Sequence, residues 1–429
     1  MIDPGIILFV VFFALLLLGV PIGVAIGCAG VFTIWHESLG MPILSANFFA
    51  GIAKFPLLAI PFFILAGIIF ERAGIAKRLI EFIKQLVGAM YGGMAVVTVA
   101  AALFWGAVSG SGPATVAALG IMLIPAMAAA GYPKPFAAAL TSAASGLAII
   151  IPPSIAFIIY GYITGDSVTA LFAAGIIPGI VVGLTLAATA YFISRKRGYR
   201  GEPRTSWNAV WVAFLRSFWG LLAPVIILGG IYGGIATPTE AAVVAVFYGL
   251  FVGFFIYRTM CVKDLYKILV DSAVASAVVM LIVSFAGIFS WAGQSVNVMD
   301  KSANFILSIT SHPILILILM NIVLLISGMF LDAISIYYVF LPIFIPLMEH
   351  FGWNSIWFGV LMTVNLAIGQ ITPPVAVNLY VGANVANITL EEISTPVIPF
   401  ILAAVAALAI LILFPEISLF MPRLLGYIQ

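Results

Sequence analysis

The stretch Ile150-Ile151-Pro152-Pro153 returns 221 residues later as Ile371-Thr372-Pro373-Pro374. A proline pair removes two backbone donors and disfavours helical geometry in the residue before it, so each copy predicts a helix interrupted at this point. The match extends over residues 103–180 and 324–401 at the same offset and includes prolines, glycines and large apolar residues. Two copies of one interrupted unit in hydrophobic sequence predict a transporter built from repeats.

The composition of the 429 residues places the chain in a membrane. Apolar residues make up 64% and charged residues 7%, whereas about a quarter of the residues of soluble domains are charged. Because backbone polar groups must be satisfied inside a bilayer, this much continuous apolar sequence predicts an all-α polytopic membrane protein. The net charge of +2 gives no indication of nucleic-acid binding.

Breakers and segment lengths divide the chain into two repeats, residues 1–200 and 201–429. Each repeat is expected to hold one helical hairpin, at about 92–131 and 313–349. Each also holds one broken helix, at about 135–163 and 355–385. Unbroken spans are predicted at 4–19, 21–36, 55–71, 171–194, 217–235, 238–257, 269–292 and 396–421.

Three basic loops orient these spans. They are Arg72–Lys84, Arg195–Arg204 and Arg258–Lys267, and the positive-inside rule places all three in the cytoplasm. Each repeat crosses the membrane five times. Because five is an odd number, the second repeat is expected to be inverted relative to the first. We therefore expect a multi-pass protein of the bacterial inner membrane with both termini in the periplasm.

The predicted tip of the first hairpin is Ser109-Gly110-Ser111-Gly112-Pro113-Ala114-Thr115. Carbonyl groups at one half-helix end suit a cation such as Na⁺. Free N–H groups at the other end suit a carboxylate. The alternative interpretation is a turn of small residues that only lets two helices pack closely.

The second tip, Ser327–Ser335, contains Asp332, the only acidic residue between Asp300 and Glu349. A carboxylate at this depth should face an ion, a cavity or a partner rather than lipid. It could equally be the N-cap of the returning helix, and the two roles are compatible.

The two proline breaks are surrounded by small and polar residues. Those of the first break are Ser142, Ser145, Gly146 and Ser154, and those of the second are Asn365, Gly369, Gln370, Thr372 and Asn378. Irregular backbone at mid-membrane is tolerated where it lines protein or a water-filled site. A simple kink is the alternative. The two tips and two breaks together predict one substrate pocket and two Na⁺ sites.

Four motifs resemble a known family. They are Phe55-Pro56-Leu57-Leu58-Ala59-Ile60-Pro61, the first tip at 109–115, Thr237-Pro238-Thr239-Glu240-Ala241-Ala242, and Ile371–Pro374. They are similar to motifs in the large membrane (DctM-like) subunit of tripartite ATP-independent periplasmic (TRAP) transporters. The resemblance implies an elevator-type fold of the ion-transporter superfamily, a separate small four-helix membrane subunit and a periplasmic substrate-binding protein. It also implies uptake driven by a Na⁺ gradient.

The resemblance also implies site residues. One Na⁺ site would use Ser109, Gly110, Ser111, Thr115, Ser145 and Pro152, and the other Gly328, Asp332, Ser335, Gly369, Thr372 and Pro373. For the substrate we expect contacts from Ser109, Gly112, Pro113, Ser154, Asn365 and Asn378. The family's ligands are organic acids, among which the sialic-acid and C4-dicarboxylate types are the candidates.

Three other functions remain as alternatives. A stand-alone Na⁺- or H⁺-coupled anion carrier would need no binding protein, and a channel would show no gradient-driven accumulation. An intramembrane enzyme would need a base near Ser109, but no histidine is predicted near mid-membrane. An ATP-driven pump would need a phosphate-binding G-x-x-x-x-G-K-[ST] loop, which the sequence lacks.

Overall fold

The computed structural model describes residues 3–199, 201 and 206–428. These residues form helices and connecting turns, with no strand among them. Eight of their helices are long and apolar enough to cross a membrane. Helices α1 (Pro4–Leu17) and α2 (Ile22–His36), at the first two predicted spans, are also apolar but have 14 and 15 residues. The prediction of an all-helical membrane protein is confirmed.

The first half continues with α3 to α10. Their bounds are α3 (Ile43–Ala50), α4 (Ala59–Arg72, after the 3₁₀ turn η1, Phe55–Leu58), α5 (Ile75–Val87), α6 (Gly93–Ser109), α7 (Gly112–Ala129), α8 (Lys134–Ser145, continued by the 3₁₀ turn η2, Gly146–Ile149), α9 (Ile155–Thr164) and α10 (Val168–Arg197).

The second half contains α11 to α20. Their bounds are α11 (Trp207–Tyr232), α12 (Pro238–Phe251, continued by the π-helical turn η3, Val252–Ile256), α13 (Val262–Ser295), α14 (Val298–Ile309), α15 (Pro313–Gly328), α16 (Ala333–Phe351), α17 (Ser355–Gly369), α18 (Val377–Ala386), α19 (Leu390–Leu413) and α20 (Glu416–Leu424).

The interrupted helices lie where the sequence predicts them. The first hairpin turns between α6 and α7, where Gly110 has a left-handed φ of +64° and Ser111 is extended. Glycine adopts this conformation without the steric cost of a Cβ atom. The second hairpin turns between α15 and α16, and the proline pairs separate α8 from α9 and α17 from α18. The inverted relation of the repeats and the side of each terminus stay predictions.

Several expectations about the connecting segments are wrong. The basic segment Arg72–Lys84 is largely the amphipathic helix α5 rather than a loop, and α14 is a second short helix with a charged first turn. The expected span 396–421 is two helices, because Pro415 follows the end of α19 at Leu413. Arg200 and Arg204 of the second basic loop lie outside the described residues.

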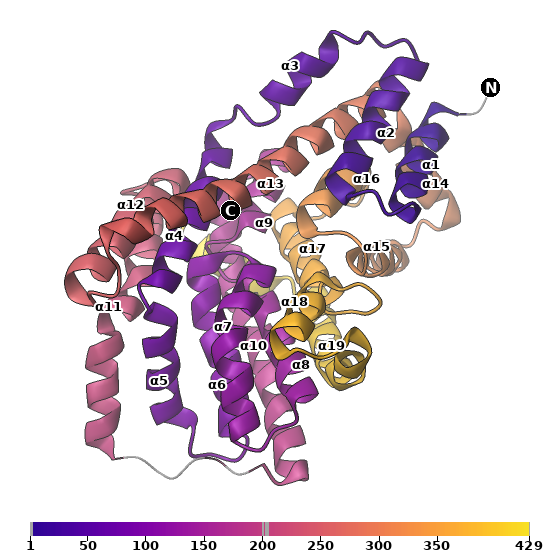
Figure 1. Cartoon of the computed structure of the whole chain (residues 1–429). Coiled ribbons are helices and arrows are strands. Elements are labelled where there is room, and N and C mark those ends of the chain that lie inside the picture. Colours follow the sequence, from indigo (N-terminus) through magenta and orange to yellow (C-terminus); the bar gives the residue numbers. More distant parts are fainter. Residues whose placement is uncertain (1–2, 200, 202–205, 429) are drawn as a thin grey trace.

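The helices pack as two groups that contact each other along one interface, the seam. In the first group α7 packs on α8 and α18, α15 on α17, and α10 on α6 and α19. In the second, α2 packs on α1 and α13, and α12 on α4 and α11. Figure 1 shows α13 running diagonally along the molecule from the α12 end to the α2 end. Contacts of α13 with α16, and of α4 with α6 and α9, join the groups along this seam.

Candidate functional site

The tip of the first hairpin carries hydroxyl groups in a largely buried turn. Ser109 and Thr115 are buried and Ser111 is half-buried. The Ser109 hydroxyl donates to the carbonyl of Ser111 over 3.4 Å. The Thr115 hydroxyl oxygen is buried without a hydrogen-bond partner among the described residues. The tip therefore retains polar groups that its own fold does not satisfy.

The first proline break lies directly against this tip. A Cβ atom on Gly110 would lie 2.9 Å from the carbonyl oxygen of Pro153, so these backbones are in close contact. The Ser145 hydroxyl donates to the Thr141 carbonyl at 2.8 Å, and the Ser154 hydroxyl donates to Ile149 at 2.6 Å. Both hydroxyl protons are thus used within the break, and only oxygen lone pairs remain for a ligand.

The second tip is closed by a carboxylate cap and a tight glycine contact. Asp332 accepts hydrogen bonds from the backbone N–H groups of Ile334 (3.0 Å) and Ser335 (3.4 Å), and the Ser335 hydroxyl donates to the same carboxylate. The capping role considered for Asp332 is therefore present. A Cβ atom on Gly369 would lie 2.6 Å from the Gly328 Cα atom, so α15 and α17 touch through their backbones.

The second break is held to the second tip by its backbone. The N–H of Ala376 donates to the carbonyl of Met329 at 3.0 Å, and the N–H of Asn378 donates to the carbonyl of Gln370 at 3.0 Å. The Thr372 hydroxyl donates to Ile368 at 2.7 Å. Ala376 has a φ of +49°, an uncommon conformation for a residue with a Cβ atom. Such conformations persist where the surrounding structure fixes them.

The first tip and the second break meet at Gly112. A Cβ atom there would lie 2.7 Å from Gln370 Oε1 and 2.9 Å from both amide atoms of Asn378. Gln370 Oε1, Asn378 Oδ1 and Asn378 Nδ2 are buried and lack hydrogen-bond partners in residues 3–199, 201 and 206–428. Unsatisfied buried amide groups at a half-helix N-terminus form a binding surface for a polar ligand or for water.

Asn365, an expected substrate contact, uses its amide N–H₂ group in packing between helices. Asn365 donates from Nδ2 to the backbone carbonyl of Asn321 at 3.0 Å and to its Oδ1 at 2.9 Å, which ties α17 to α15. Its own Oδ1 is buried without a partner in the described chain. Gln370 was noted in the sequence but not assigned to the substrate. Its signal was a polar glutamine in apolar sequence, three residues before Pro373.

A small cavity opens beside the first tip. It has a volume of about 180 Å³ and is lined by Ser109 and Ser111 of the tip, by Glu71 of α4, by Ile155 of α9 and by Val279 of α13. It therefore lies on the seam between the two helix groups. In the described residues no three His, Cys, Asp or Glu side chains gather as metal ligands. The polar atoms available at the two tips are carbonyl and hydroxyl oxygens and the Asp332 carboxylate, the kind of oxygen donors that hard cations take.

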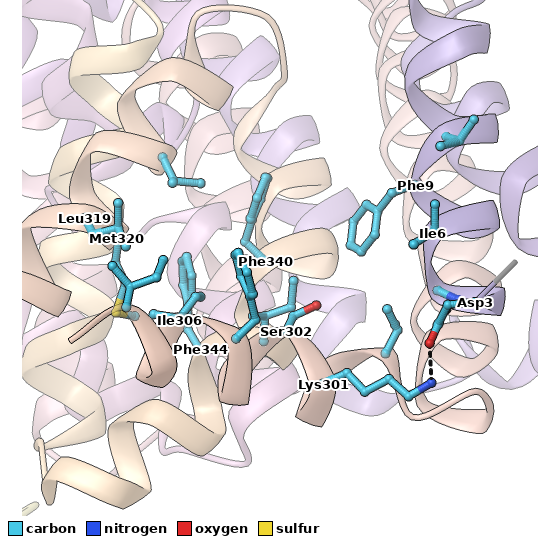
Figure 2. A pocket seen from close by; sticks show the side chains of 17 residues that line it. Asp3, Ile6, Phe9, Lys301, Ser302, Ile306, Leu319, Met320, Phe340 and Phe344 are labelled. Carbon is cyan, nitrogen blue, oxygen red and sulfur yellow. Dashed lines mark hydrogen bonds and ion pairs between the residues drawn. The ribbon is translucent and has the colours of Figure 1, made fainter. Parts of the chain in front are cut away.

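A second, apolar crevice of about 600 Å³ is lined by residues of α1, α14, α15 and α16 (Figure 2). Phe9 of α1, Phe305 of α14 and Phe340 of α16 are among its lining residues, and the Lys301 ammonium bonds the Asp3 carboxylate at 2.6 Å at its edge. This bond and the N–H of Gly5 hold the pKa of Asp3 below its usual value. Because its one cation is already paired, the crevice is a poor site for an organic anion.

A family model described as "Tripartite ATP-independent periplasmic transporter, DctM component" matches residues 9–417. The chain belongs to this family. The resemblance to the large (DctM-like) subunit is thereby confirmed, and the chain is a multi-pass membrane protein of a transporter family.

Relatives in this family are named for different substrates. The isethionate TRAP transporter permease protein DctMQ of Oleidesulfovibrio alaskensis is 43% identical over 425 residues, which are 98% of this chain and 66% of that relative. The C4-dicarboxylate TRAP transporter large permease protein DctM of Rhodobacter capsulatus is 36% identical, over 98% of this chain and 99% of its own length. The sialic acid TRAP transporter large permease protein SiaM of Vibrio cholerae is 36% identical, over 97% of this chain and 98% of its own.

A solved structure has the same fold at low sequence identity. The crystal structure of the Alcanivorax borkumensis YdaH transporter aligns with a TM-score of 0.62 at 15% identity and covers 90% of this chain and 87% of that one. The similarity shows that the two chains share the overall arrangement of their helices.

Filling the junction at Gly112 tests the site. We expect Gly112→Ala to lower transport by about tenfold or more, a loss of at least 1.4 kcal/mol, because its methyl group would occupy the space in front of Gln370 and Asn378. The atoms it meets are ends of flexible side chains, so thermal stability should stay close to that of the wild type. Uptake into proteoliposomes measures transport, and thermal unfolding in detergent measures stability. Wild-type uptake by the variant would exclude Gly112 from the site.

Proposed function

We propose that this chain is the permease subunit of a Na⁺-coupled, binding-protein-dependent secondary transporter that imports an organic acid by an elevator movement. The observation that carries the proposal is the junction at Gly112. There, a half-helix N-terminus of the first hairpin faces unpaired amide groups of the second break. Half-helix N-termini suit anionic groups of substrates, and unwound carbonyls suit Na⁺.

Two Na⁺ positions follow from the two tips. The first would use the carbonyl and hydroxyl oxygens of Ser109, Gly110, Ser111, Thr115, Ser145 and Pro152. The second would use Gly328, Asp332, Ser335, Gly369, Thr372 and Pro373. Support comes from the close backbone contacts of Gly110 with Pro153 and of Gly328 with Gly369, which hold each tip against its break. Pro113 follows Gly112, and Ser154 lies between Pro153 and Ile155, which approach Gly110. Both remain proposed substrate contacts.

The packing of the helices supports the elevator movement. Helices α6–α10 and α15–α19 would form the mobile group, and α1–α4 and α11–α13 the fixed scaffold. The short helices α5 and α14 connect the groups along the chain, after α4 and after α13. The cavity beside Ser109 lies on the seam where such a movement would open access. A small membrane subunit and a periplasmic binding protein would complete the transporter.

Transport assays test the function. The chain and its small subunit would be placed in proteoliposomes with labelled isethionate, succinate or sialic acid, with and without an inward Na⁺ gradient and the cognate binding protein. We expect accumulation of one of these acids only when both Na⁺ and the binding protein are present. Accumulation with Na⁺ alone would make the chain a stand-alone carrier. Equilibration without accumulation would make it a channel.

A further inference from the structure

A polar cavity of about 340 Å³ lies on the same seam, away from the tip of the first hairpin. Asn47 of α3 and Lys54, just before η1, line it on the scaffold side together with Gln294 of α13. Tyr162 of α9 and Tyr338 of α16 line it on the side of the mobile group. Its lining contains one lysine and no acidic residue, so the cavity is electropositive.

Three hydrogen-bond donors of this cavity lack partners. Asn47 Nδ2 and the Tyr338 hydroxyl are buried atoms without a hydrogen bond in the described chain. The Lys54 ammonium likewise forms no ion pair or hydrogen bond there, although its side chain is exposed. An ammonium, an amide N–H₂ and a phenol O–H can all donate to one carboxylate or sulfonate. Buried donors without partners are costly, which favours a ligand or water that satisfies them.

The cavity and the one beside Ser109 lie at two levels of one seam. Each is lined by α9 and α13, but at different positions along both helices. Tyr162 and Gln294 line the polar cavity, whereas Ile155 and Val279 line the cavity beside the tip. Lys54 likewise precedes α4, whose later residue Glu71 lines the cavity beside the tip. A mobile group that slides along α13 would carry its bound anion from one level to the other.

We propose that the cavity around Lys54 is an anion-binding vestibule that receives the carboxylate or sulfonate of the organic acid before it reaches the hairpin tips. The inference rests on the proposed transport function. Lys54 attracts the anion by its charge, and Asn47 and Tyr338 position it by hydrogen bonds. A cationic cavity raises the local concentration of an anionic ligand and the rate of its capture.

Charge removal at Lys54 tests the vestibule. Uptake of isethionate, succinate and sialic acid would be measured in the complete transporter carrying Lys54→Gln, Lys54→Arg or Tyr338→Phe. We expect Lys54→Gln to raise the KM of the transported acid by about tenfold, equivalent to 1.4 kcal/mol, with little change in the maximal rate. Lys54→Arg should restore most of the affinity, and Tyr338→Phe should raise KM by a smaller factor.

Lys134→Gln is the matched control, because Lys134 begins α8 and lines neither cavity. Thermal unfolding of each variant confirms that it folds. An unchanged KM in Lys54→Gln, or an equal change in Lys134→Gln, would overturn the vestibule while leaving the transport function in place. Failure of the wild type to transport any of the three acids would overturn the proposed function and the vestibule with it.

Discussion

Replacing Gly328 with alanine is expected to abolish transport and to destabilise the fold. Its Cβ atom would lie 2.9 Å from the Gly369 Cα atom, and the converse substitution at Gly369 would place a Cβ atom 2.6 Å from Gly328 Cα. In both cases the obstructing atoms are backbone, so α15 and α17 would have to separate. Overpacking of this kind costs about 1–3 kcal/mol. Separation would also move the second tip away from its break.

Uptake and thermal unfolding would both be measured for Gly328→Ala and Gly369→Ala. Gly229→Ala on α11 is the control, because no atom lies within 4 Å of the added Cβ position and its φ is not left-handed. Alanine in a helix interior is favoured over glycine by about 0.5–1 kcal/mol, so this control should be neutral or slightly stabilising. Wild-type stability in Gly328→Ala would mean that α15 and α17 are not in backbone contact.

The sequence predicted the breaks in the helices well, because their signals are local. A glycine turn at Gly110 and the two proline pairs interrupt a helix whatever surrounds them. The short helices α5 and α14 were missed because they carry polar faces and therefore fall below the hydropathy of a span. Pro415 was overlooked because, apart from Glu416, the sequence around it is largely apolar.

The composition of the site was only partly predictable. Polar residues near each tip and break were identifiable, since polar groups in apolar sequence are few. Which of them meet depends on packing between distant helices. The approach of Gly112 to Gln370 joins residues 258 positions apart in the chain, and no local pattern encodes it. For the same reason no local pattern shows that Lys54 lines a cavity together with residues of α9, α13 and α16.

Asp332→Asn is expected to weaken the dependence of transport on Na⁺ while leaving the fold intact. Asparagine caps a helix about as well as aspartate. Asn354 already caps α17 in the same way, since its side-chain oxygen accepts from the N–H groups of Ile356 at 3.0 Å and Trp357 at 3.1 Å. The substitution at Asp332 therefore preserves the cap of α16 but removes the negative charge, and it replaces the oxygen that accepts from the Ser335 hydroxyl with an amide N–H₂ group.

If that charge holds a cation, the half-saturating Na⁺ concentration for uptake should rise by about tenfold or more, equivalent to at least 1.4 kcal/mol of binding. Ser335→Ala, which removes a donor to the same carboxylate, should change it less. Asn354→Asp is the matched control, because it adds a charge to the equivalent cap of α17 and should leave the Na⁺ dependence unchanged. The same Na⁺ dependence in Asp332→Asn and the wild type would reduce Asp332 to a helix cap, and the second ion position would then have to rely on carbonyl and hydroxyl oxygens alone.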